Sequence, residues 1–226
     1  MPTRAIVFDL DDTLYRIRRF TIAGYAATSA VIAAASGRSR RDVFCRLQGL
    51  YRRGRAPFAY QELCAELGLP APLAAEWLAR HRAHRRRLRL PRTSAVALDQ
   101  LRRARWRIGL LTNGLPQIQQ AKVRALDLES RMDVIVCADE FVPGGKPAPE
   151  VFTRTLDALG VPPDRAVMVG DHPENDIAGA RRLGMRTIRV LRPAFPTVAA
   201  AEDADALVED LAPVPAIAGR LLGGPA

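Results

Sequence analysis

Three carboxylates, Asp9, Asp11 and Asp12, lie close together near the start of the chain. They follow residues 5–8 (AIVF), a short apolar run with β-branched residues that is typical of a buried parallel strand. Like charges at one strand end cost folding free energy unless a cation or a reacting group lies among them. Because ligands of open α/β sheets bind at the carboxyl ends of strands, this cluster is a candidate site for catalysis or metal binding. The alternative is an acidic loop in which Asp residues only form a turn.

Three further polar clusters follow predicted strands later in the chain. Their chemically distinctive residues are Thr112, Asn113, Gly114, Lys146, Asp171, His172 and Asp176. Each cluster has a simpler interpretation: a common turn, a surface lysine, or the residues that begin a helix. Because all four clusters come at strand ends, we expect them to form one site.

The elements that must position these clusters alternate along the second part of the chain. The pattern predicts helices over 93–105, 117–126, 150–159 and 175–183, and strands over 108–112, 134–137, 166–169 and 186–190. Together with a strand over 4–9 they predict an α/β fold, a Rossmann-like three-layer core with a parallel sheet. One or two short helices are expected after Pro193.

The residues between the first strand and this alternating part have no strand pattern. Helices are expected over 22–35, after an N-cap at Ser39, over 58–67 and over 72–90. The predicted domains are therefore an α/β core of residues 1–14 and 92–226, and an inserted α-helical domain of residues 15–91.

With these motifs in place, the chain resembles the haloacid dehalogenase superfamily of phosphohydrolases over residues 4 to about 192. The helical insertion after the first strand is similar to the family's cap domain of subfamily I (C1 cap). The resemblance implies that Asp9 is the nucleophile that forms an aspartyl-phosphate. It also implies that Asp11 is the acid and base for the leaving group and for water.

The resemblance assigns the remaining motif residues to the metal and to the phosphate. Mg²⁺ would be held by the Asp9 carboxylate, the Asp11 backbone carbonyl and Asp171, with Asp176 supporting the metal shell or the lysine. Lys146 would neutralise phosphate oxygens. Thr112 and the adjacent backbone amides of Asn113 and Gly114 would hydrogen-bond these oxygens.

Asp11 favours phosphate over halide chemistry, since displacing a halide needs no proton donor. Asp12 is expected to shape the loop, and His172 to lie on the surface or behind the site. His81 and His84 share a helix face with Trp77, which favours packing over metal binding.

These residues predict a Mg²⁺-dependent phosphatase for a small anionic metabolite, such as a nucleotide, a phosphosugar or phosphoglycolate. A phosphomutase on the same scaffold is one alternative, because it would return the phosphoryl group to a sugar. A binding or regulatory protein without turnover is the other. No feature of the sequence indicates an oligomeric state.

Charge is distributed unevenly along the chain. The net charge is +10, and residues 14–92 contribute 17 arginines against four acids, which is +13. Some of these arginines could bind the substrate, with Arg16, Arg18 and Arg19 favoured by position, while those near helix ends are equally explained as solvated. The arginines that crowd the ends of two predicted helices of the insertion are Arg52, Arg53, Arg55, Arg80, Arg82, Arg85, Arg86, Arg87 and Arg89. Without interleaved aromatic residues, no specific nucleic-acid binding is expected.

The sequence also predicts a cytoplasmic protein. No apolar stretch is long enough for a membrane span, and Asp9 to Asp12 interrupt any signal-like start. Cys45, Cys64 and Cys137 are widely spaced in apolar surroundings, as expected for reduced cysteines.

Overall fold

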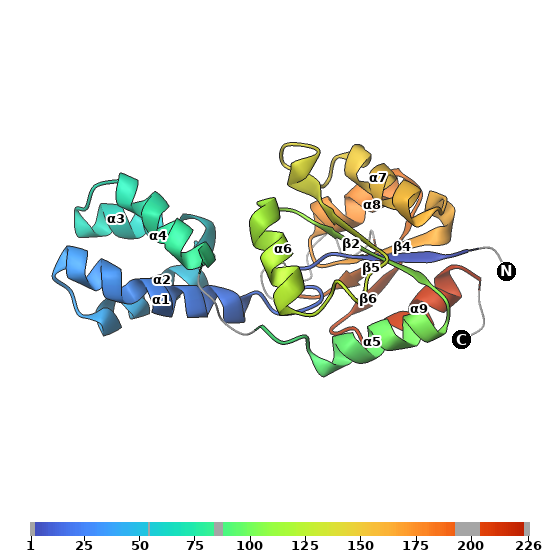
Figure 1. Cartoon of the computed structure of the whole chain (residues 1–226), viewed down its shortest axis with the longest axis horizontal. Coiled ribbons are helices and arrows are strands. Elements are labelled where there is room, and N and C mark those ends of the chain that lie inside the picture. Colours follow the sequence, from blue (N-terminus) through green and yellow to red (C-terminus); the bar gives the residue numbers. More distant parts are fainter. Residues whose placement is uncertain (1–2, 54, 84–87, 193–203, 224–226) are drawn as a thin grey trace. The chain divides into compact units, whose positions relative to one another are not determined.

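The computed structural model describes residues 3–53, 55–83, 88–192 and 204–223, and it divides into two compact units (Figure 1). Unit 1 contains residues 1–16 and 88–226, and unit 2 contains residues 17–87. The described residues do not include the end of the last helix predicted in the insertion, which contains His84, Arg85, Arg86 and Arg87. They also do not include the first part of the tail after Arg192.

Unit 1 is built on a parallel six-stranded sheet with the strand order β3-β2-β1-β4-β5-β6. The strands are β1 (Ala5–Phe8), β2 (Arg107–Thr112), β3 (Val134–Cys137), β4 (Ala166–Gly170), β5 (Arg186–Val190) and β6 (Ala206–Val208). Every residue of β1 and β4 is buried, as expected for strands covered on both faces. The predicted α/β class is therefore confirmed.

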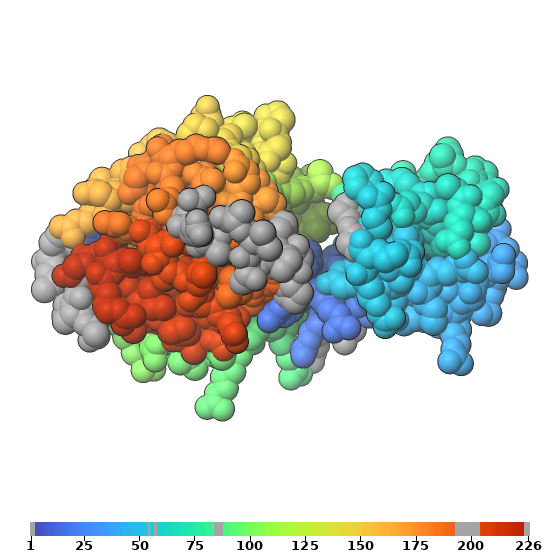
Figure 2. All heavy atoms as spheres, turned by 180° about the vertical axis from the view of Figure 1, so that it is seen from behind, coloured from blue at the N-terminus to red at the C-terminus, as the bar shows by residue number. Residues whose placement is uncertain are grey.

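Helices cover both faces of this sheet (Figure 1). The helices α5 (Arg92–Arg103) and α9 (Val214–Leu221) pack together on one side, and α7 (Pro149–Leu159) packs with α8 (Gly179–Arg182) on the other. The helix α6 (Pro116–Ala125) connects β2 to β3. Seen from behind, β6 and α9 in red lie beside the orange segments around β5 (Figure 2). Short 3-10 turns occupy Ala138–Glu140 and Pro163–Arg165.

Two elements of unit 1 differ from the sequence prediction. The segment predicted as a helix over 175–183 begins as a π-helix at Pro173–Ala178 and continues as α8. The described part of the tail contains the strand β6 as well as the helix α9, whereas only helices were expected. Leu191 donates its backbone N–H to the carbonyl of Val208 at 2.8 Å, so the tail extends the sheet beside β5.

The described residues of unit 2 form four α-helices. They are α1 (Arg18–Ser36), α2 (Arg40–Arg52), α3 (Ala59–Leu67) and α4 (Pro72–Ala83), with a 3-10 turn at Ala56–Phe58. Ser39 caps α2 by accepting the N–H of Asp42 at 3.1 Å, as the sequence predicts. The described part of α4 runs to Ala83, and residues 88–90 are not helical, so the helix predicted over 72–90 does not reach its predicted end.

The core of unit 2 contains polar side chains among aromatic rings. His81 is buried and packs against the rings of Tyr25 and Tyr60, and its Nδ1 lies 2.8 Å from the Tyr60 hydroxyl. That hydroxyl also lies 2.9 Å from Oγ1 of Thr28. His81 therefore packs in the helical core, as predicted. Among the described residues, none of the helices has the length and apolar character needed to cross a membrane.

Candidate active site

The predicted site residues come together at the carboxyl edge of the sheet in unit 1. β1 lies between β2 and β4, where the chain order of the sheet changes direction, and ligands of open α/β sheets bind at such a point. A hollow of about 210 Å³ opens there. Its lining residues are Asp9, Asp11, Thr112, Asn113, Lys146, Asp171, His172, Asn175 and Asp176.

Lys146 is a buried cation of this site. Its ammonium donates to Asp9 Oδ1 at 2.7 Å, to Asp176 Oδ1 at 2.6 Å and to the backbone carbonyl of Leu111 at 2.9 Å. Burial lowers the pKa of Lys146, but Asp176 and Asp9 together hold it above its ordinary value. The lysine therefore stays charged and partly neutralises two carboxylates.

The remaining negative charge in the site is incompletely balanced. Burial raises the pKa of Asp9 to about 7, because the effect of Lys146 does not fully offset it. Burial, with Asp9 and Asp176 adding to it, raises the pKa of Asp171 to about 8. Two carboxyl groups that resist ionisation side by side are favourable ligands for a cation, which would supply the missing positive charge.

The donor set fits a magnesium ion. Carboxylate oxygens of Asp9, Asp171 and Asp176 lie within 4.8 Å of one another. Both oxygens of Asp176 already accept hydrogen bonds, from Lys146 and from the N–H of His172. Asp9 and Asp171 are therefore the carboxylates best placed to hold Mg²⁺, an ion that takes few protein ligands and retains waters.

The loop around Asn113 is shaped by side chain to backbone hydrogen bonds. Asn113 Oδ1 accepts the N–H of Lys146 at 2.8 Å, and its Nδ2 donates to the carbonyls of Gly144 at 3.1 Å and Lys146 at 3.0 Å. The Asn113 side chain thus fixes the loop that carries Lys146. Gly114 donates its backbone N–H to Asp139 and does not line the hollow. Thr112 is buried and does line the hollow.

The turn after β4 positions the last cluster. His172 accepts the N–H of Asn175 on its Nδ1 at 3.1 Å and so caps the following helix. Burial lowers the pKa of His172. A Cβ atom on Gly170 would lie 2.3 Å from Asp176 Oδ2, so this position must remain glycine for Asp176 to reach Lys146.

Three residues that contact Asp11 were missed by sequence reasoning: Tyr15, Gln119 and Lys122. Lys122 Nζ and the Tyr15 hydroxyl each lie 2.5 Å from an Asp11 oxygen, and Gln119 Nε2 lies at 3.3 Å. Gln119 and Lys122 are both buried on α6. The available signal was composition, because Lys122 and Lys146 are the only two lysines of the chain.

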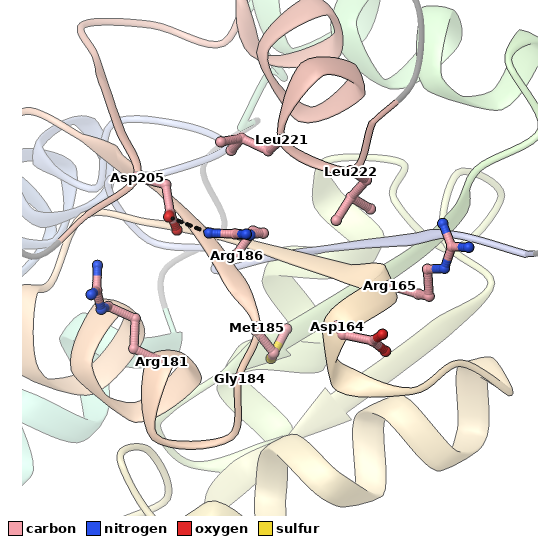
Figure 3. A pocket seen from close by; sticks show the side chains of 9 residues that line it. All are labelled: Asp164, Arg165, Arg181, Gly184, Met185, Arg186, Asp205, Leu221 and Leu222. Atoms are coloured by element: carbon pink, nitrogen blue, oxygen red, sulfur yellow. Dashed lines mark hydrogen bonds and ion pairs between the residues drawn. The ribbon is translucent and has the colours of Figure 1, made fainter.

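A second hollow of unit 1 lies away from these residues, near the amino ends of β4 and β5 (Figure 3). It measures about 450 Å³, and Arg186 and Asp205 form an ion pair across it at 3.1 Å. Arg165 and Arg181 point in different directions in this view. None of the predicted site residues lines this second hollow.

A doubly wound parallel sheet with carboxylates and a buried lysine at its switch point places the chain among the α/β proteins whose ligands bind at the carboxyl ends of the strands. The chain belongs to the haloacid dehalogenase-like hydrolase family, whose sequence profile matches residues 3–184. The predicted family is therefore confirmed, and the subfamily of its cap remains a prediction.

Relatives within this family carry phosphatase names. A glyceraldehyde 3-phosphate phosphatase of Methanopyrus kandleri is 31% identical over 197 residues, covering 84% of each chain. A phosphoserine phosphatase of Thermus thermophilus is 36% identical over 140 residues, which are 61% of this chain and 56% of that protein. The match thus spans little more than half of the second relative. These relatives support the predicted enzyme class, a phosphatase.

The fold has close counterparts among solved structures. The crystal structure of a proposed β-phosphoglucomutase from Thermotoga maritima superposes with a TM-score of 0.72 at 21% identity, covering 96% of this chain and 99% of that one. At this identity the likeness concerns the fold alone.

Proposed function

We propose that this chain is a Mg²⁺-dependent phosphomonoester hydrolase that acts on a small phosphorylated metabolite through an aspartyl-phosphate. The observation that carries the proposal is the pairing of one buried ammonium, Lys146, with both Asp9 and Asp176 beside Asp11 and Asp171. Phosphoryl transfer requires a nucleophile, a proton donor and positive charge around the transferring group, and this arrangement supplies each of them.

In the first step an Asp9 carboxylate oxygen attacks phosphorus. The new bond is a P–O bond to Asp9, and the bond that breaks joins phosphorus to the leaving alcohol, whose oxygen takes a proton from Asp11. In the second step water attacks the phosphorus of this aspartyl-phosphate. Asp11 accepts a proton from the water, inorganic phosphate leaves, and Asp9 returns to its carboxylate form.

The other residues bind and orient the phosphoryl group. Lys146 would offset the negative charge of the phosphoryl group while remaining hydrogen-bonded to Asp9, and Thr112, which lines the hollow, would donate a hydrogen bond from its hydroxyl. Asn113 and Asp176 hold Lys146 in position. Mg²⁺ bound by Asp9, the Asp11 carbonyl and Asp171 would supply further positive charge to the phosphate oxygens.

We further propose that the helical residues 15–91 act as a cap that selects the substrate, with residues 1–14 and 92–226 as the catalytic core. The phosphatase relatives are named for phosphoserine and for glyceraldehyde 3-phosphate, which supports testing small phosphate esters first. The basic character of the insertion supports an anionic substrate.

The decisive experiment is a phosphate-release screen over small phosphomonoesters, with Mg²⁺ and with EDTA. We expect release only with the metal, and a loss of at least about 10³-fold in kcat for Asp9→Asn, because no nucleophile remains. Asp164→Asn, on the surface away from the site, is the matched control and should keep full activity. Full activity of Asp9→Asn, turnover without metal, or transfer of the phosphoryl group to a sugar instead of water would contradict the proposal.

A further inference from the structure

The Asp11 carboxylate is held by donors from two separate segments of unit 1. The Tyr15 hydroxyl comes from the loop after β1, whereas Gln119 and Lys122 come from α6. The ammonium of Lys122 lies 2.5 Å from Asp11 Oδ2, and the lysine is only 5% exposed. Two of the residues that orient Asp11, Gln119 and Lys122, are therefore far from it in the sequence.

Helix α6 has the geometry to keep these contacts fixed. Gln119 and Lys122 are three residues apart and so share one face of the helix. Gln119 also donates to the backbone carbonyl of Asn113, which ties this face of α6 to the turn after β2. The helix thereby joins the Asp11 carboxylate to the loop that contains Thr112 and Asn113.

We propose that Lys122 is a positioning residue that holds the Asp11 carboxyl group toward the leaving-group oxygen. This inference rests on the proposed phosphatase function, and it assigns a role to a residue outside the four sequence motifs. Each of the two carboxylates that take part in the reaction then has its own ammonium: Lys146 for Asp9 and Lys122 for Asp11.

The composition of the chain supports this assignment independently. Lysine and arginine together number 34, yet only Lys122 and Lys146 are lysine. Both are buried, and both contact a carboxylate of the site. An ammonium is a compact point charge, whereas a guanidinium is a wider planar fork, so a buried position next to a single carboxylate oxygen favours lysine.

The proposal predicts a dependence on the leaving group. An alkyl phosphate needs a proton on its departing oxygen, whereas p-nitrophenolate departs readily without one. Misplacing Asp11 should therefore slow the hydrolysis of an alkyl phosphate more than that of p-nitrophenyl phosphate. A residue needed only for folding, or only for binding phosphate, would affect both substrates alike.

The test compares Lys122→Met in the full chain with wild type on 2-glycerophosphate and p-nitrophenyl phosphate, in the presence of Mg²⁺. We expect kcat for 2-glycerophosphate to fall about 10²-fold, and kcat for p-nitrophenyl phosphate to fall much less. Arg124→Met, an exposed position of the same helix, is the matched control and should change neither. An equal fall on both substrates, or no fall, would overturn the proposal.

Lys122→Met leaves the Asp11 carboxylate without its ammonium and can therefore fold poorly. A double variant provides a second test in that case. Asp11→Asn combined with Lys122→Met removes both charges of the pair. If Lys122 acts through Asp11, this variant should be no slower on 2-glycerophosphate than Asp11→Asn alone. Additive losses would refute the positioning role. A wild-type chain that releases phosphate from no phosphomonoester of the screen would instead refute the proposed function, and this inference with it.

Discussion

At the scale of single residues, Asp12 differs from the two carboxylates beside it. Its φ is 60°, in the left-handed region, so its backbone forms the turn that follows β1 and Asp9. Arg192, which is 7% exposed, donates to the carbonyl of Asp12 and, at 3.5 Å, to that of Thr13. The geometry agrees with the expectation that Asp12 shapes the loop.

This backbone conformation gives a testable prediction for Asp12. Asp12→Gly should keep phosphatase activity within a few-fold and should not lower stability, because glycine adopts a positive φ without strain. Asp12→Val should lower the free energy of unfolding by about 1–2 kcal/mol, because a β-branched side chain tolerates the left-handed conformation far less well than Asp does. Urea unfolding followed by circular dichroism measures both, and equal stability of the two variants would contradict the assigned turn.

The site residues that follow strands could be predicted from the sequence, whereas those on helices could not. Asp9, Asp11, Lys146, Asp171 and Asp176 were expected in one site, and all of them line the same hollow. Lys122 lies 111 positions from Asp11 in the middle of a helix, where no turn or strand end marks it. Only the packing of α6 beside the loop after β1 brings the two together.

At the scale of elements, most strands and helices of the core were predictable because each has a simple pattern. Strands over 134–137 and 186–190 have the predicted bounds. The π-helix at Pro173–Ala178 could not be predicted, because its register depends on the tertiary contact between Asp176 and Lys146. The strand β6 is short, and its pairing with β5 is a long-range interaction.

At two glycines in helices of unit 2, substitution by alanine is expected to change the free energy of unfolding in opposite directions. A Cβ on Gly24 in α1 would lie 2.4 Å from His81 Nε2, so Gly24→Ala must displace this buried ring. We expect a loss of about 1–3 kcal/mol in the free energy of unfolding, as for other overpacked cores.

Gly49 in α2 serves as the matched control for this prediction. Its nearest neighbour for a new Cβ is the end of the Arg53 side chain at 3.2 Å, which can move aside. Gly49→Ala should gain about 0.5–1 kcal/mol because alanine favours the helix. Urea denaturation of both variants gives the comparison, and a neutral Gly24→Ala would show that His81 does not fill this space.

At the scale of the whole molecule, the raised pKa values of Asp9 and Asp171 make stability depend on pH and on metal. Their pKa values of about 7 and about 8 lie above the ordinary 3.8. At pH values between the ordinary and the raised pKa, these two carboxyl groups bind more protons in the folded chain than in the unfolded chain. The free energy of unfolding therefore falls as pH rises from about 4 to about 8. Deprotonation at the same time prepares the ligands for a cation.

We therefore expect the thermal midpoint in EDTA to decrease from mildly acidic to mildly alkaline pH. Adding Mg²⁺ should raise this midpoint by more at about pH 8 than at about pH 6, since binding requires ionised carboxylates. Differential scanning calorimetry of wild type and Asp171→Asn provides the measurement, and the variant should lose much of the response to metal. A response to Mg²⁺ that is larger at the lower pH would contradict the assigned ligands.

The placement of both lysines in one site also makes the chain suited to spectroscopy. In protein grown with ¹⁵N-labelled lysine, the only labelled side chains are Lys122 and Lys146, each next to a different carboxylate. A spectrum of the side-chain ammonium groups therefore contains two signals, and both originate within the site. A change at Asp9 or at Asp11, such as the binding of a ligand beside one of them, can then be followed at the lysine that contacts it, without background from surface lysines.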